Sequence, residues 1–127
     1  MAEKTSAEKI GDMGENIAAA LMQKKGFSVV ERNYRSKYGE IDIIAADEQY
    51  IVFAEVKTRN TSALLRPAGW VDRRKQKKII LTAMEYLSEY ENELQPRFDV
   101  IEVIYNKNTG IIIDTEHIEN AFDMSGY

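Results

Sequence analysis

Apolar positions recur at helical spacing over residues 10–21, which predicts a helix over about residues 6–25. Thr5 and Glu8 have the spacing of a capping box, in which a hydroxyl residue precedes an acid by three positions. Gly26 follows two lysines and fits the C-terminal end of that helix, because glycine tolerates the backbone conformation found there and lysine suits the negative end of the helix dipole.

Short runs of β-forming residues between turn-forming residues predict five strands. The second and third form a hairpin around residues 47–50, and the last two form a hairpin around residues 106–110. Residues 58–70 are polar and long enough to make a functional or mobile loop. The predicted strands are residues 27–32, 40–46, 51–57, 98–105 and 111–114.

A second helix is predicted from Val71, with an apolar side formed by Ile79, Ile80, Ala83 and Leu87. Residues 117–122 are predicted as a short terminal helix. The resulting order of elements predicts an α/β fold with a mixed sheet flanked by helices and one parallel crossover. The length of 127 residues favours a single domain.

Composition narrows the class of protein. Hydrophobic residues make up 44% of the chain and charged residues 30%, which is typical of a globular protein. The absence of Cys excludes disulfides and thiolate zinc sites. No apolar run reaches about 18 residues and the first residues are polar, so we expect a cytoplasmic protein without a membrane partner.

The net charge of -4 conceals an uneven distribution. Residues 57–78 hold eight basic residues and one acid, a local charge of +7, which leaves -11 for the remainder. Such a run is typical either of a solvated helix face or of a surface that contacts phosphates. The basic residues are Lys57, Arg59, Arg66, Arg73, Arg74, Lys75, Lys77 and Lys78.

The first hairpin brings acidic residues together. With residues 47–50 as the loop, paired positions sum to 97, so Asp42 is expected directly opposite Glu55. Two carboxylates in that position repel each other, and a divalent cation would relieve the repulsion. Hard cations such as Mg²⁺ and Mn²⁺ prefer carboxylate oxygens. The alternation places Ile41 on the opposite face, with Ile43.

Lys57 lies two residues after Glu55 and is expected on the same face, where its ammonium could orient water or offset phosphate charge. The alternative is a cross-strand ion pair between Lys57 and Glu40. Glu15 is a further candidate, because Gly14 beside it would allow close approach of a neighbour.

Other candidates have weaker support. His117, the single histidine, is expected on the surface or at a helix cap, with general-base catalysis as the alternative. Tyr34, Tyr38 and Trp70 could stack on unpaired bases, although each is more often a packing residue.

Several sequence blocks in the same order resemble the YraN family of bacterial proteins, over about residues 10–105. The blocks are Gly14-Glu15, Glu31-Arg32-Asn33-Tyr34-Arg35, Gly39-Glu40-Ile41-Asp42-Ile43, Glu55-Val56-Lys57, Lys75-Gln76 and Arg97-Phe98-Asp99-Val100. That family in turn resembles the PD-(D/E)xK nuclease superfamily and its archaeal Holliday-junction resolvases. The nominal Pro-Asp of the superfamily is Ile41-Asp42 here.

The resemblance implies a restriction-endonuclease-like αβββαβ core and a metal-dependent endonuclease acting on DNA, with selectivity for branched or junction DNA as one option. It implies metal binding by Glu15, Asp42 and Glu55, catalysis by these residues with Lys57, and phosphate contact by Lys75. Arg59, Arg73, Arg74 and Lys78 join Lys75 as the expected nucleic-acid contacts. A homodimer is a further expectation, because junction resolvases pair two sites. The alternative is a non-catalytic module that keeps the fold and binds nucleic acid or a protein.

Overall fold

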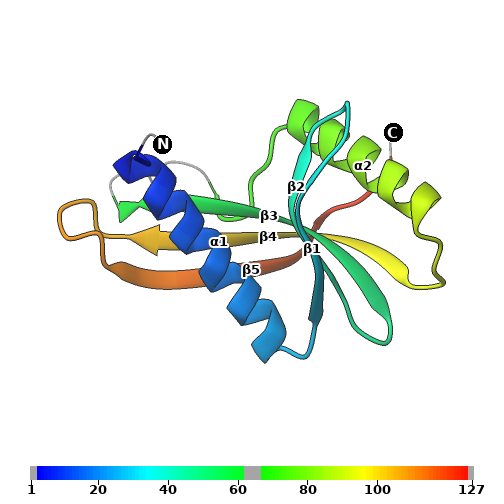
Figure 1. Cartoon of the computed structure of the whole chain (residues 1–127), viewed down its shortest axis with the longest axis horizontal. Helices are drawn as coiled ribbons and strands as arrows, with labels where there is room; N and C mark the ends of the chain where they lie inside the picture. The colour runs from blue at the N-terminus through cyan, green and yellow to red at the C-terminus, as the bar shows by residue number, and fades with distance from the viewer. Residues whose placement is uncertain (1–2, 62–66, 126–127) are drawn as a thin grey trace.

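Five strands form one mixed sheet in the order β1-β2-β3-β4-β5, in which β3 and β4 are parallel and the other neighbours are antiparallel (Figure 1). The computed structural model describes residues 3–61 and 67–125. The α/β fold and the parallel crossover through the second helix are confirmed. The elements are α1 (Ser6–Lys24), β1 (Ser28–Arg35), β2 (Glu40–Ala46), β3 (Tyr50–Asn60), α2 (Arg73–Glu89), β4 (Gln95–Tyr105) and β5 (Ile112–Phe122).

Local sequence sets the ends of both helices. Thr5 caps α1 in the expected capping box with Glu8, and Gly26 has a positive φ of 97° just after the helix ends. Asp72 caps α2 by accepting a hydrogen bond from the Lys75 amide at 2.9 Å. No helix within the described ranges is long and apolar enough to cross a membrane.

The helices pack against opposite faces of the twisted sheet (Figure 1). Alternate residues of β3 enter two separate cores, because successive side chains of a strand point to opposite faces. Phe53 packs with Ile80 of α2. Ala54 packs with Met22 of α1. The sheet is therefore covered on both sides where β2, β3 and β4 are apolar.

The strict alternation predicted for β2 is wrong at its start. Ile41 packs in the α2 core with Ile44, whereas Ile43 packs in the α1 core. The expected arrangement had Ile41 and Ile43 on one face. The change of face occurs around Asp42, beyond the last pair of the β2–β3 ladder, where β2 remains paired with β1 alone.

The predicted terminal helix is also wrong, because residues 117–122 belong to β5. They pair with β4, as in the pair of Val100 with Ile118. β1 and β3 run further than predicted, to Arg35 and Asn60, so the loops that follow them are shorter. Residues 62–66, which include Arg66 of the basic segment, lie outside the described residues.

A buried polar network ties β4, β5 and α1 together. Arg97 donates two hydrogen bonds to Asp99, at 2.9 and 2.8 Å, and the Asn120 amide donates a third at 3.0 Å. His117 Nε2 lies 2.7 Å from Asp99 Oδ2, and its Nδ1 lies 2.8 Å from Lys25 Nζ at the end of α1. The surface position expected for His117 is wrong, since its side chain is only 2% exposed.

Candidate functional site

Asp42 lies where β2 and β3 separate. The register predicted for this hairpin is confirmed from Ala46 opposite Ile51 to Ile43 opposite Ala54, but the ladder ends there. Asp42 and Glu55 are thus near each other without forming the expected ladder pair. Asp42 Oδ2 instead accepts a hydrogen bond from the Val56 amide at 2.7 Å, so a carboxylate takes the place of a backbone acceptor.

The two carboxyl groups raise the local cost of negative charge. Burial is the largest cause that raises the pKa of Asp42 to about 7, and the nearby Glu55 carboxylate adds to it. Repulsion from the Glu15 and Glu40 carboxylates raises the pKa of Asp42 further, whereas the hydrogen bond from the Val56 amide favours the charged form and lowers that pKa. Burial also raises the pKa of Glu55. The site therefore favours the approach of positive charge.

Two lysines supply part of that charge. Lys75 Nζ on α2 lies 3.3 Å from Glu55 Oε1. Lys57, two residues along β3 from Glu55, donates to the Trp70 carbonyl oxygen, and burial lowers the pKa of its ammonium. The alternative pairing of Lys57 with Glu40 is not the one observed, because Glu40 forms an ion pair with Arg35 at 3.3 Å.

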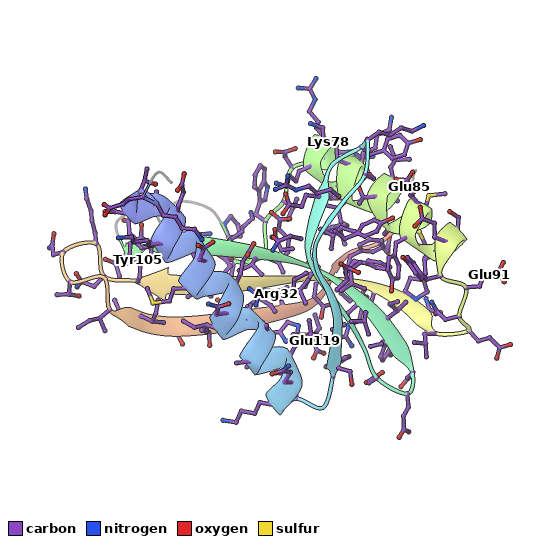
Figure 2. All side chains as sticks on the ribbon, viewed as in Figure 1. Arg32, Lys78, Glu85, Glu91, Tyr105 and Glu119 are labelled. Carbon is purple, nitrogen blue, oxygen red and sulfur yellow. The ribbon has the colours of Figure 1, made fainter. Side chains whose placement is uncertain are left out.

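Glu15 approaches the site from α1. Gly14 is buried, and a Cβ added there would overlap the Thr58 Cγ2 methyl group of β3. The lack of a side chain at Gly14 therefore permits the close approach of α1 to β3 that the sequence suggested. Arg32 Nη2 lies 3.9 Å from Glu15 Oε2 and donates to Asn16 at 2.9 Å. Figure 2 shows Arg32 beside α1.

Asn33 is a connecting residue that the sequence analysis did not select. With its side-chain amide oriented to satisfy both neighbours, its nitrogen donates to Glu40 at 2.9 Å and to Glu15 at 3.2 Å. Its backbone φ of 54° is in the left-handed region, which asparagine tolerates better than most residues. An Asn between Arg32 and Tyr34 in β1 was the signal available in the sequence.

The donor set suits a hard divalent cation in a limited way. Asp42 and Glu55 offer carboxylate oxygens in a region where burial disfavours their charge, and Mg²⁺ commonly takes only one or two protein carboxylates. Within residues 3–61 and 67–125, no three Asp, Glu or His side chains are placed to hold an ion together. Glu15 thus lies near the pair without completing a three-residue cage.

The predicted nucleic-acid contacts fall into two groups. Arg73, Arg74 and Lys75 occupy the first turn of α2, and Lys78 follows one turn later. Figure 2 shows Lys78 near the start of α2 and the acidic Glu85 further along the helix.

Arg59 is placed differently from the basic residues of α2. Its side chain is 15% exposed, and its Nη1 lies 2.7 Å from the buried Glu102 carboxylate. Glu102 also accepts a hydrogen bond from the Gly69 amide at 2.5 Å. The sequence analysis did not select Glu102, because its partners on β3 and in the segment before α2 are far away along the chain.

The chain resembles known proteins over most of its length. A sequence model described as "Uncharacterised protein family UPF0102" matches residues 14–103. A UPF0102 protein of Caldanaerobacter subterraneus subsp. tengcongensis is 41% identical over 121 residues, covering 94% of this chain and 99% of the relative. One from Clostridium botulinum strain 657 is 46% identical over 118 residues, covering 91% and 94% of the two chains. Another, from Prosthecochloris aestuarii, is 44% identical, covering 89% and 92%.

Proposed function

The chain belongs to the uncharacterised protein family UPF0102, the YraN family, and we propose that it is a metal-dependent endonuclease that hydrolyses phosphodiester bonds in DNA. The observation that carries the proposal is the pair of half-buried carboxyl groups, Asp42 and Glu55, beside the ammonium groups of Lys57 and Lys75. Carboxylates suit a metal ion, and the ammonium groups beside them, with the basic first turn of α2, suit the phosphates of a DNA substrate.

Asp42 and Glu55 would hold Mg²⁺ or Mn²⁺, with Glu15 as a third acid nearby. When bound, the ion would lower the pKa of a coordinated water and offset charge on the scissile phosphate. Val56 fixes the position of the Asp42 carboxylate through its amide. The Lys57 ammonium donates to the Trp70 carbonyl oxygen and is influenced by the charges of Glu102 and Glu55, and from there it would orient water or contact phosphate.

The first turn of α2 would bind the DNA backbone. Lys75 forms an ion pair with Glu55, and its ammonium would contact a phosphate oxygen of the bound DNA. Arg73 and Arg74 precede it on the same turn. Arg59 would support the site from inside, through Glu102, more than through direct phosphate contact.

The test is cleavage of labelled duplex, flap, single-stranded and four-way-junction DNA with Mg²⁺ or Mn²⁺. We expect cutting by the wild type and its loss in Asp42→Asn and Glu55→Gln, whereas Glu116→Gln on the exposed part of β5 should cut like the wild type. Cutting that persists in both site variants, or that needs no metal, would contradict the proposal.

The second candidate function is a non-catalytic module that binds nucleic acid or a protein partner. It is favoured by the lack of a three-ligand cage among the described residues and by the ion pair that already engages Glu55. Calorimetric titration with Mn²⁺ separates the two functions. Heat that disappears in Asp42→Asn supports the nuclease, and the absence of heat in the wild type supports the module.

A further inference from the structure

Resting on the proposed nuclease function, we propose that Trp70 is a platform on which an unpaired nucleobase stacks, so that the substrates are DNAs with unpaired bases near the scissile phosphate. The Trp70 side chain is 39% exposed, and its ring centroid lies 5.8 Å from Lys57 Nζ. An aromatic ring therefore lies next to the ammonium that is proposed to face phosphate.

The backbone on both sides of Trp70 is anchored. Gly69 has a positive φ of 77°, donates its amide to buried Glu102, and packs so closely on Ile118 that an added Cβ would lie 3.0 Å from that side chain. Val71 on the other side is buried in the α2 core. The backbone at Trp70 is therefore held in place, and little backbone freedom is lost when a base stacks on the ring.

The position of the ring relates it to the chemistry. The Trp70 carbonyl oxygen accepts a hydrogen bond from Lys57, which is two residues from Glu55 on the same face of β3. A base that contacts Trp70 therefore belongs to a nucleotide close to the phosphate at Glu55 and Lys57.

Stacking selects for unpaired bases. In a continuous duplex both faces of each base are covered by neighbouring bases, whereas a base in a tail, flap or junction can leave the stack. Base–aromatic stacking contributes about 1–3 kcal/mol per base, and it commonly occurs beside a basic groove that follows the backbone. Here the basic first turn of α2 begins three residues after Trp70. Tyr34 is not an equivalent candidate, because its ring packs edge-on against Tyr86 with centroids 5.2 Å apart.

Trp70 is the single tryptophan of the chain, so its fluorescence reports on this contact directly. The experiment uses the full chain carrying Asp42→Asn, to prevent cutting, with a blunt DNA duplex and with the same duplex extended by an unpaired thymine tail. Binding is measured in parallel by anisotropy of labelled DNA. We expect the tailed duplex to quench the fluorescence and the bound blunt duplex to leave it nearly unchanged.

Substitution provides the second measurement. In the same background, Trp70→Leu should weaken binding of the tailed duplex roughly 5- to 150-fold and leave binding of the blunt duplex unchanged. Trp70→Phe should retain most of the affinity. Tyr90→Leu, at the far end of α2, is the control for loss of an exposed aromatic residue and should have no effect.

Each outcome decides the proposal. Equal quenching by both DNAs, no quenching by bound tailed duplex, or no DNA binding at all would overturn it. Cleavage by the wild type tests the proposed function separately. Selective quenching without any metal-dependent cutting would keep the stacking platform and reject the endonuclease.

Discussion

At the scale of single residues, Asp42 both completes the sheet and places negative charge where burial disfavours it. Its carboxylate accepts the Val56 amide at 2.7 Å, yet its pKa is raised to about 7. The hairpin register was sufficient to select Asp42 as a candidate and to predict that it lies near Glu55. Its bond to Val56 did not, because the end of a ladder depends on how β2 also pairs with β1.

The raised pKa of Asp42 predicts an unusual pH dependence of the free energy of unfolding in the absence of metal. Between pH 3.8 and about 7 the folded protein holds a proton that the unfolded chain has released, so the free energy of unfolding falls as pH rises. Asp42→Asn removes this effect and should be more stable than the wild type at pH 8, by roughly 1–2 kcal/mol. Urea unfolding at several pH values in a chelator measures the difference.

Asp114→Asn on the exposed part of β5 is the control for loss of one carboxylate and should keep the pH dependence of the wild type. The same slope in Asp42→Asn as in the wild type would contradict the prediction.

Gly14 allows a second prediction at this scale. Helix propensity alone favours Gly14→Ala by up to about 1 kcal/mol, but the added methyl would overlap Thr58 Cγ2, and overpacking commonly costs about 1–3 kcal/mol. We expect Gly14→Ala to lower the melting temperature and Gly14→Ala with Thr58→Ser to restore most of it. Gly11→Ala, on the same helix with no neighbour within 4 Å, should raise it. A stabilising Gly14→Ala would refute the close packing.

At the scale of elements, α2 carries its charges in the order that its own dipole disfavours. Basic residues fill its first turn, no acid lies there, and no basic residue lies in its last turn. The sequence was sufficient to predict this feature, because the start of α2 and its charges are local. Local sequence was not sufficient for residues 117–122, because they form a strand only through pairing with β4.

The charge order of α2 leads to a prediction that separates stability from binding. Arg73→Gln with Arg74→Gln should raise the free energy of unfolding by several tenths of a kcal/mol through the dipole. The same variant should bind DNA more weakly, and its dependence of log K on log salt should become shallower by about 0.9 for each phosphate that the variant no longer neutralises.

Lys24→Gln with Lys107→Gln removes the same charge at the end of α1 and in the β4–β5 turn. Fluorescence anisotropy over a salt series should give this control the wild-type slope. Equal slopes for all three proteins would exclude α2 as the phosphate-binding element.

At the scale of the whole molecule, the buried network around Asp99 joins segments that are distant in sequence. Burial by itself raises the pKa of Asp99, but hydrogen bonds from His117, Arg97 and the Asn120 amide outweigh it and hold that pKa below its ordinary value. The order of elements and the parallel crossover followed from local patterns. This network could not, because its partners come together only after β4, β5 and the end of α1 have packed.

Asp99→Asn should therefore destabilise the protein by roughly 3–5 kcal/mol, because it removes the charge of the buried carboxylate that both Arg97 and His117 contact. In the wild type, the contribution of Asp99 is present above its ordinary pKa of 3.8 and is lost as pH falls through the lower folded value. Urea unfolding near neutral pH tests the magnitude. A loss below about 1 kcal/mol, similar to that of an exposed Asp114→Asn, would show that the network adds little.

The hydrogen bond from Val56 to Asp42 also bears on how this family can change over evolutionary time. Replacement by an apolar residue leaves a backbone amide without its acceptor, so selection for folding alone retains an acceptor at this position. Asn keeps that acceptor and removes the charge. A homologue with Asn here would keep the sheet intact and lose the negative charge that the proposed metal ion needs.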